Sequence, residues 1–368
     1  MIKKILIIFM ILISIICIVF GGKFMKKSDI FTPYPEKNLL ETAESSARPV
    51  YEMLNETEKS IYSALYNGII DKKNEIPLPC EISGDVYSKI YCILEKQEGD
   101  FFYIDSTYYT AEKIRNAQIV FREYTVEIEP KITQLESIAE SIISNAPDGD
   151  YEKALYIHDY ITGICTYDTG DDYEYSATAY GCLVEGQANC EGYAKAFNYL
   201  ASRLDMKCIL VTGKTDKGEN HAWNQIMIDG KWYNLDATWD DMDSPDGTRR
   251  VYFLCSDETF GRTHIADNSY FTPFTCNATE NNYYIKNGLF AQNNSDADEI
   301  IRREISSGKS VIEMKFADNQ AYSDFKTEYI DGQKMFDVVL ESGYISTGQI
   351  AVTLRETEEE YCITMDFS

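Results

Sequence analysis

Basic residues are scarce in this sequence. Its 368 residues include 34 Lys and Arg against 60 Asp and Glu, which gives a formal net charge of −26. Because the phosphates of a nucleic acid bind Lys and Arg, this charge argues against a nucleic acid as the partner. The acidic balance suits a soluble, exported or surface protein, and it could attract cationic substrates.

Two common zinc-enzyme motifs are absent from the sequence. Neither Cys-x-x-Cys nor His-Glu-x-x-His occurs, and the acidic pair Asp240 and Asp241 lacks the spaced ligand loop of a calcium site. The sequence therefore predicts neither a bound metal nor a cofactor.

Charge is also absent from one long stretch near the N-terminus. Residues 5–22, ILIIFMILISIICIVFGG, lie between the basic segments MIKK and KFMKK. A basic start followed by an apolar run indicates a secretory signal or an uncleaved signal anchor. The run is long for a signal core and just long enough to span a bilayer, which slightly favours the anchor. We expect an extracytoplasmic protein, membrane-anchored or secreted, that meets the membrane only through this segment.

The length favours two or three domains. Breaks in the apolar pattern divide the chain into a signal peptide or anchor (1–27), a stalk (28–50), an N-terminal α/β module (51–147), a central domain (148–290) and a C-terminal α/β module (291–368). Within the N-terminal module the pattern predicts strands over 101–109 and 117–127. Pro130 is expected to end that unit, before a helix over 131–145.

The cysteine count leaves two interpretations open. Of the ten cysteines, nine follow Cys17. An odd number permits four disulfides and one free thiol in an exported protein. Reduced, buried cysteines explain the same count equally well.

One cysteine stands at the start of a predicted helix, in ANCEGYAKAFNYLASRL (188–204). From Tyr193 onward, apolar residues recur with helical spacing along one face. Asn189 can cap the free backbone N–H groups at the helix start. Cys190 therefore falls in the first turn, where the helix dipole favours thiolate over thiol.

A histidine and an aspartate lie on one predicted hairpin, NHAWNQIMIDGKWYNLDATWDD. Asp-Gly between two alternating runs is a strong signal for a two-residue turn. If Ile228 pairs with Lys231 across this turn, His221 pairs with Thr238 and Trp223 with Asp236. All four then share one face, so that His221 and Asp236 are diagonal neighbours.

The cysteine and the hairpin together supply a nucleophile, a base and an orienting carboxylate: Cys190, His221 and Asp236. The unsatisfied backbone N–H of Cys190 can point at a developing oxyanion, and Gln187 is a second oxyanion candidate, although a role in loop structure is favoured for it.

Other aromatic and histidine residues are given lesser roles. Trp223 and Trp239 are candidates to line a substrate cleft, although core packing is expected for two of the three tryptophans. His158, on a helix among apolar neighbours, is interpreted as structural, and His264 is left unassigned because no motif accompanies it.

Three blocks together resemble the transglutaminase-like superfamily: AYGCLVEGQANCEGYAKAF, HAWNQIMIDGKWYNLDATWDD and YFLCSDE. The resemblance covers roughly residues 150–265 and is closest to the bacterial exported group related to kyphoscoliosis peptidase. It implies an α+β fold, with a papain-like core whose nucleophile helix packs on an antiparallel sheet. It also implies a triad at Cys190, His221 and Asp236.

Two classes of function follow from these observations. The first is a cysteine enzyme that acts on amide bonds through a thioester, either as a protease or amidase or by transfer to an amine. Its partner would be a protein or peptide substrate, with a cell-wall peptide among the candidates. The second is a non-catalytic surface-binding or scaffold protein, but such a protein has no need for an intact triad.

Overall fold

The structure is a computed structural model that describes residues 33–41, 47–105, 112–170, 173–241, 249–343 and 350–367. The predicted signal or anchor segment lies outside these residues. Within the described ranges, no helix has the length and apolar character needed to cross a membrane.

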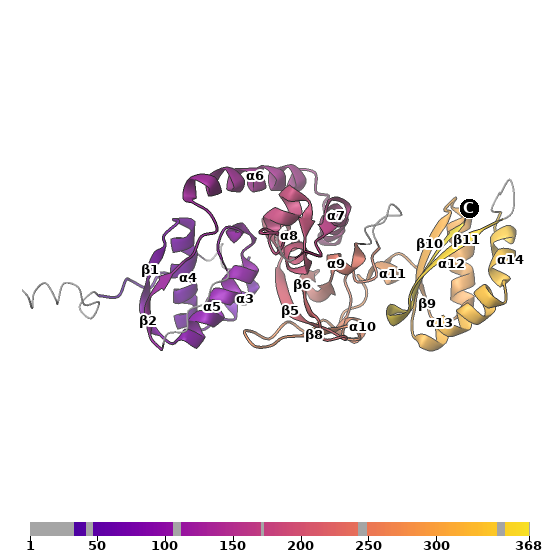
Figure 1. Cartoon of the computed structure of the whole chain (residues 1–368). Helices are drawn as coiled ribbons and strands as arrows, with labels where there is room; N and C mark the ends of the chain where they lie inside the picture. Colours follow the sequence, from indigo (N-terminus) through magenta and orange to yellow (C-terminus); the bar gives the residue numbers. More distant parts are fainter. Residues whose placement is uncertain are drawn as a thin grey trace, which may run out of the picture.

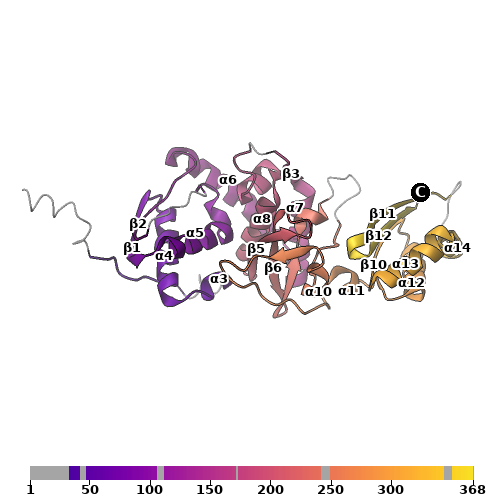
Figure 2. The ribbon, with the colours of Figure 1, turned by 60° about the horizontal axis from the view of Figure 1, so that its bottom comes forward.

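Helices and sheets follow one another along the chain in three groups (Figures 1 and 2). The first holds a two-stranded sheet, and the second and third each hold a four-stranded sheet packed with helices. This mixture of helices and mainly antiparallel sheet confirms the predicted α+β class.

The first group contains α3 (Pro49–Glu52), α4 (Glu56–Ile70), β1 (Glu75–Ile82), α5 (Gly84–Gln97), η2 (Gly99–Phe101) and β2 (Ile114–Gln118). Helix α4 begins where the sequence is best suited to start it, because Asn55 and Glu58 form a reciprocal capping box. In its described part, residues 101–105, the predicted strand over 101–109 is not formed: a 3₁₀ helix ends at Phe101, a turn follows, and Ile104 makes only an isolated bridge to Phe121. Residues 106–109 of that prediction lie outside the described residues. The second predicted strand is shorter than expected and begins earlier, at Ile114.

The prediction that Pro130 ends the first unit is also wrong. Helix α6 (Thr125–Ile143) contains Pro130 within its second turn. The proline lacks the N–H that would bond to the carbonyl of Val126. Because Val126 is exposed, water can solvate that carbonyl, and the helix continues across the top of the molecule in Figure 1.

The central group places a helix against a sheet. It comprises α7 (Asp150–Ile164), β3 (Thr166–Tyr167), η3 (Gly181–Glu185), β4 (Gln187–Ala188), α8 (Cys190–Arg203), β5 (Cys208–Thr215), β6 (Asn220–Ile228), β7 (Lys231–Leu235), α9 (Ala237–Asp240), α10 (Asp257–Phe260) and β8 (His264–Ala266). The strands run antiparallel in the order β7-β6-β5-β8. Helix α8 packs on β5 and β6, where Ala194 meets Leu210 and Ala222. The residues of its predicted apolar face, Tyr193, Ala196, Phe197 and Leu200, are all buried.

The predicted Asp-Gly hairpin is confirmed. Ile228 pairs with Lys231, and Asp229 and Gly230 both have positive φ, 52° and 77°, as a type I′ turn requires. The expected pairing of His221 with Thr238 is wrong, because β7 ends at Leu235 and Thr238 lies in α9. Asp236 caps that helix instead of continuing the strand.

Helix α5 of the first group anchors α8 from outside. Lys195 of α8 is buried and lies 2.5 Å from Glu95 of α5. Gln97 exchanges two hydrogen bonds with the backbone of Leu210 in β5, at 2.8 and 3.0 Å. Helix α8 is therefore held both by its packing on the sheet and by a buried ion pair with α5.

The third group contains α11 (Tyr283–Lys286), β9 (Phe290–Ala291), α12 (Asn294–Ser306), β10 (Val311–Phe316), α13 (Asn319–Phe325), η4 (Lys326–Asp331), α14 (Lys334–Glu341), β11 (Val352–Thr357), η5 (Glu358–Glu360) and β12 (Cys362–Phe367). Its sheet has the order β11-β12-β10-β9, with β9 parallel to β10 and the other pairs antiparallel.

His158 fastens α7 to α9 inside the central group. Its ring is fully buried, with Nδ1 3.0 Å from Asp159 Oδ1 and Nε2 3.1 Å from Asp240 Oδ2. Burial opposes the charged imidazole, but the two carboxylates outweigh it and raise the pKa of His158. Both ring nitrogens are satisfied, which agrees with a structural role.

We expect His158→Gln to lower the free energy of unfolding by about 3 kcal/mol, because it breaks a buried charged contact. Urea denaturation followed by circular dichroism measures this change. The control is Glu140→Gln, an exposed position on α6, which should stay within about 0.5 kcal/mol of the wild type. Equal midpoints for the wild type and His158→Gln would contradict the structural role.

Candidate active site

Cys190 is the first residue of α8, as predicted. The Asn189 side chain accepts the backbone N–H groups of Glu191 and Gly192, at 3.0 and 3.2 Å. The cap therefore leaves the N–H of Cys190 itself free to meet another acceptor. The thiol is half-buried and packs against Ala194, Leu210 and Ala222.

Tyr167 contacts the same cysteine and was not found from the sequence. Strand β3 pairs in parallel with β4, so that Tyr167 lies beside Ala188, two residues before Cys190. Tyr167 is near enough to Cys190 to interact with it electrostatically, and burial, with smaller contributions from Cys190 and Asp236, raises the pKa of the Tyr167 hydroxyl. No spacing in the sequence relates Tyr167 to Cys190 until the pairing of these short strands is known.

His221 and Asp236 meet as predicted, although Asp236 lies just beyond β7 and caps α9. His221 Nε2 lies 2.7 Å from Asp236 Oδ2, and Cys190 is near enough to His221 to contribute to its raised pKa. Since Asp236 occupies Nε2, Nδ1 is the ring nitrogen that remains for the thiol. The other oxygen of Asp236 accepts the backbone N–H groups of Thr238 and Trp239, at 2.9 and 3.3 Å. The start of α9 thus fixes the carboxylate.

The charged forms of His221 and Asp236 stabilise each other, although both side chains are buried. Burial opposes an imidazolium, but the charge and hydrogen bond of Asp236, with a smaller contribution from Cys190, raise the pKa of His221 to about 10. Burial would likewise raise the pKa of the Asp236 carboxyl, but His221 and His264 hold it well below its usual range. Near neutral pH, His221 is therefore protonated and Asp236 is ionised.

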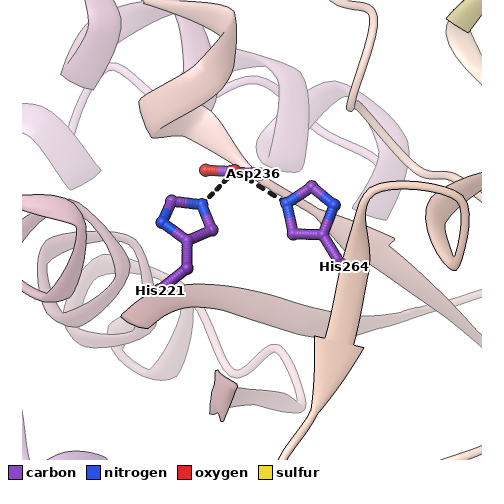
Figure 3. A group of neighbouring side chains, drawn as sticks. All are labelled: His221, Asp236 and His264. Carbon is purple, nitrogen blue, oxygen red and sulfur yellow. Dashed lines mark hydrogen bonds and ion pairs between the residues drawn. The ribbon is translucent and has the colours of Figure 1, made fainter. Parts of the chain in front are cut away.

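His264 is a second imidazole on the same carboxylate (Figure 3). It reaches Asp236 from β8, an edge strand that pairs with β5, and its Nε2 lies 3.1 Å from Asp236 Oδ2. No sequence motif assigned a role to His264. The pairing of β8 with β5 brings His264 to Asp236, and no local sequence pattern predicts this contact.

The three tryptophans lie in different surroundings. Trp239 is half-buried and its ring stacks on His221, with centroids 5.1 Å apart. Trp223 is 2% exposed and packs against Phe260, while Trp232 stacks on Phe274. The cleft role proposed for Trp223 and Trp239 stays a prediction.

Gln187 is held by a neighbouring loop. Its side-chain nitrogen donates to Asp168 Oδ1 at 3.0 Å, and Asp168 also accepts the N–H of Gly170. This bond ties the β3 and β4 segments together beside Cys190. The oxyanion role of Gln187 stays a prediction.

Two further chemical alternatives concern metals and disulfides. His221, Asp236 and His264 offer three ligand atoms within 4.8 Å of one another, but the 2.7 and 3.1 Å contacts also have the length of charge-assisted hydrogen bonds. None of the nine cysteines that follow Cys17, all of which the structure describes, forms a disulfide.

These features define a papain-like α+β domain with a cysteine at a helix start, a histidine on an antiparallel sheet and an aspartate just beyond the end of the neighbouring strand. Residues 136–237 match the family model of the transglutaminase-like superfamily. This central region is therefore a transglutaminase-like domain, as the sequence motifs predicted.

The chain is similar to two curated proteins. Kyphoscoliosis peptidase from Homo sapiens is 29% identical over 126 residues, and that from Mus musculus is 28% identical. Each match covers 28% of this chain, and the chain spans only 19% of the length of these relatives. A solved TGase structure is 18% identical, with a TM-score of 0.28 over 32% of this chain and 34% of that one.

We expect Asp236→Asn to lower the pKa of His221 from about 10 toward the ordinary value of about 6.5, because the charge that favours imidazolium is lost. With only three histidines in the sequence, NMR of histidine-labelled protein follows each ring against pH. His158 should keep its titration and serves as the internal control. An unchanged His221 titration in Asp236→Asn would contradict this electrostatic account.

The same shift sets a pH dependence of stability. The folded-state pKa of His221 lies above its unfolded value, so its contribution to stability is fully present below about pH 6.5. The contribution is lost as the pH rises through about 10.

Proposed function

We propose that this chain is an exported cysteine enzyme that acts on amide bonds of proteins or peptides through a thioester intermediate. The observation that carries this proposal is the 2.7 Å contact of His221 with the buried Asp236 carboxylate, beside a cysteine at the start of α8 that contributes to the raised pKa of His221. Membership of the transglutaminase-like superfamily supports it, since hydrolysis and acyl transfer by cysteine are typical of that superfamily.

Each group has a chemical task in this proposal. The Cys190 thiolate attacks the amide carbon, and the backbone N–H at the start of α8 stabilises the oxyanion. His221, already protonated, gives its proton to the leaving amine as the C–N bond breaks and the thioester remains. Asp236 keeps the ring oriented and stabilises its cation. Water or an amine then attacks the thioester, His221 takes up the proton of that nucleophile, and the thiolate is released.

The second step decides between a peptidase or amidase and a transglutaminase. The outcome depends on whether the substrate cleft admits an amine and excludes water, and we favour hydrolysis. Among substrates, a cell-wall peptide fits an exported enzyme. Export itself rests on the apolar segment over residues 5–22, as does attachment to the membrane.

The test is turnover of a peptide library by the full chain, with and without an added primary amine, read by product mass. Hydrolysis, deamidation and amine transfer give different masses. We expect Cys190→Ser and His221→Ala each to lose roughly 10⁴-fold or more, with losses that do not add, because nucleophile and base act as one unit. Asp236→Asn should keep the fold and a residual rate.

His158→Gln is the matched control for the loss of a histidine outside the triad. It should retain turnover in the fraction of protein that is folded. Wild-type turnover by Cys190→Ser, or abolished turnover in folded His158→Gln, would show that the site is assigned wrongly.

A further inference from the structure

We propose that His264 is a positioning residue of the triad, which holds the Asp236 carboxylate from the side opposite His221. This inference rests on the proposed function, because it assigns a task within the same reaction. His264 would not touch the substrate. It would act through Asp236, and its loss would change how well His221 is oriented.

The hydrogen bonds of Asp236 leave it no freedom to turn. Oδ2 lies 2.7 Å from His221 Nε2 and 3.1 Å from His264 Nε2, and Oδ1 accepts two backbone N–H groups from α9. An ionised carboxylate accepts about four hydrogen bonds and donates none. All four positions are thus filled, and both Nε2 atoms carry a proton that points at Oδ2.

His264 is itself fixed in place. Its Nδ1 lies 2.9 Å from the Thr263 hydroxyl, so both ring nitrogens have partners. Its ring stacks on Phe260 with centroids 3.8 Å apart, and Trp239 lies against it at 4.5 Å. A buried ring held in this way can transmit its orientation to the carboxylate it contacts.

Residues of the third group of elements cover His264 and Thr263. Thr263 Oγ1 is 3.5 Å from Glu360 Oε1, and Glu360 pairs with Lys315 at 2.8 Å. Lys315 Nζ also lies 3.4 Å from the carbonyl oxygen of Val251 in the central region. Since these residues are buried, the C-terminal sheet shields His264 from water.

Two substitutions separate the hydrogen bond of His264 from its packing. His264→Phe keeps a planar ring among Phe260 and Trp239 but removes the donor to Asp236. His264→Gln keeps an N–H donor of similar reach. It is the conservative variant, which should restore the properties that His264→Phe loses. Circular dichroism and thermal unfolding verify that each variant is folded.

The first readout needs no substrate. In the wild type we expect two hydrogen-bonded imidazole N–H protons at low field in the NMR spectrum, from His221 and His264, that both disappear in Asp236→Asn. His264→Phe should lose its own signal and broaden that of His221, because the carboxylate is no longer held. The alkylation rate of Cys190 by iodoacetamide should fall roughly 10- to 100-fold in His264→Phe, the range expected for one hydrogen bond to a charged group. In His264→Gln it should stay near that of the wild type.

The second readout is kinetic and uses any peptide that the wild type turns over. We expect His264→Phe to lower kcat with little change in KM, and His264→Gln to recover most of kcat. An unchanged alkylation rate and an unchanged His221 signal in folded His264→Phe would overturn the inference while leaving the triad intact. If wild-type Cys190 is not alkylated preferentially, the proposed function fails instead.

A chelator provides the last control. Added EDTA should leave both N–H signals and the alkylation rate unchanged. Loss of the signals or the rate, restored by Zn²⁺, would overturn the inference, because His221, Asp236 and His264 would then be metal ligands.

Discussion

The buried negative charge of Asp236 is the constraint on which the candidate active site depends. A carboxylate removed from water is costly unless charge and hydrogen bonds compensate it. Here two imidazoles and two backbone N–H groups do so. Because these partners come from β6, β8 and α9, the charge can be accommodated only when the sheet is correctly formed. The chemistry and the fold of the central region are therefore coupled through one residue.

The sheet and α8 set the positions of His221 and Cys190 around the Asp236 carboxylate. The hairpin presents His221 from β6, while α8 packs across β5 and β6 and places Cys190 against Ala222, the residue after His221. Helix α5 also holds α8 through the buried pair of Glu95 and Lys195. The first group of elements thus contributes to the position of Cys190, although it supplies none of the three candidate residues.

Local signals were sufficient to predict part of the candidate site. A cap and a helical period predicted that Cys190 starts a helix, and an Asp-Gly turn predicted that His221 and Asp236 lie close together. The same local reasoning failed where a longer context decided the outcome. Helix α6 tolerates Pro130 because the carbonyl left without a helix bond belongs to the exposed Val126. Asp236 leaves the strand to cap α9. Tyr167 and His264 reach the site only through strand pairings that are distant in sequence, so the pattern of residues could not reveal them.

Site-resolved alkylation of the wild-type thiols tests the central claim most directly. Burial, the largest influence on both thiols, raises the pKa of Cys255 and of Cys362 to about 12, which should leave them unreactive near neutral pH. Mass spectrometry after brief exposure to iodoacetamide should find Cys190 modified well ahead of these two thiols, and this preference should vanish in His221→Ala. Equal, slow modification of several cysteines in the wild type would contradict an activated Cys190–His221 pair.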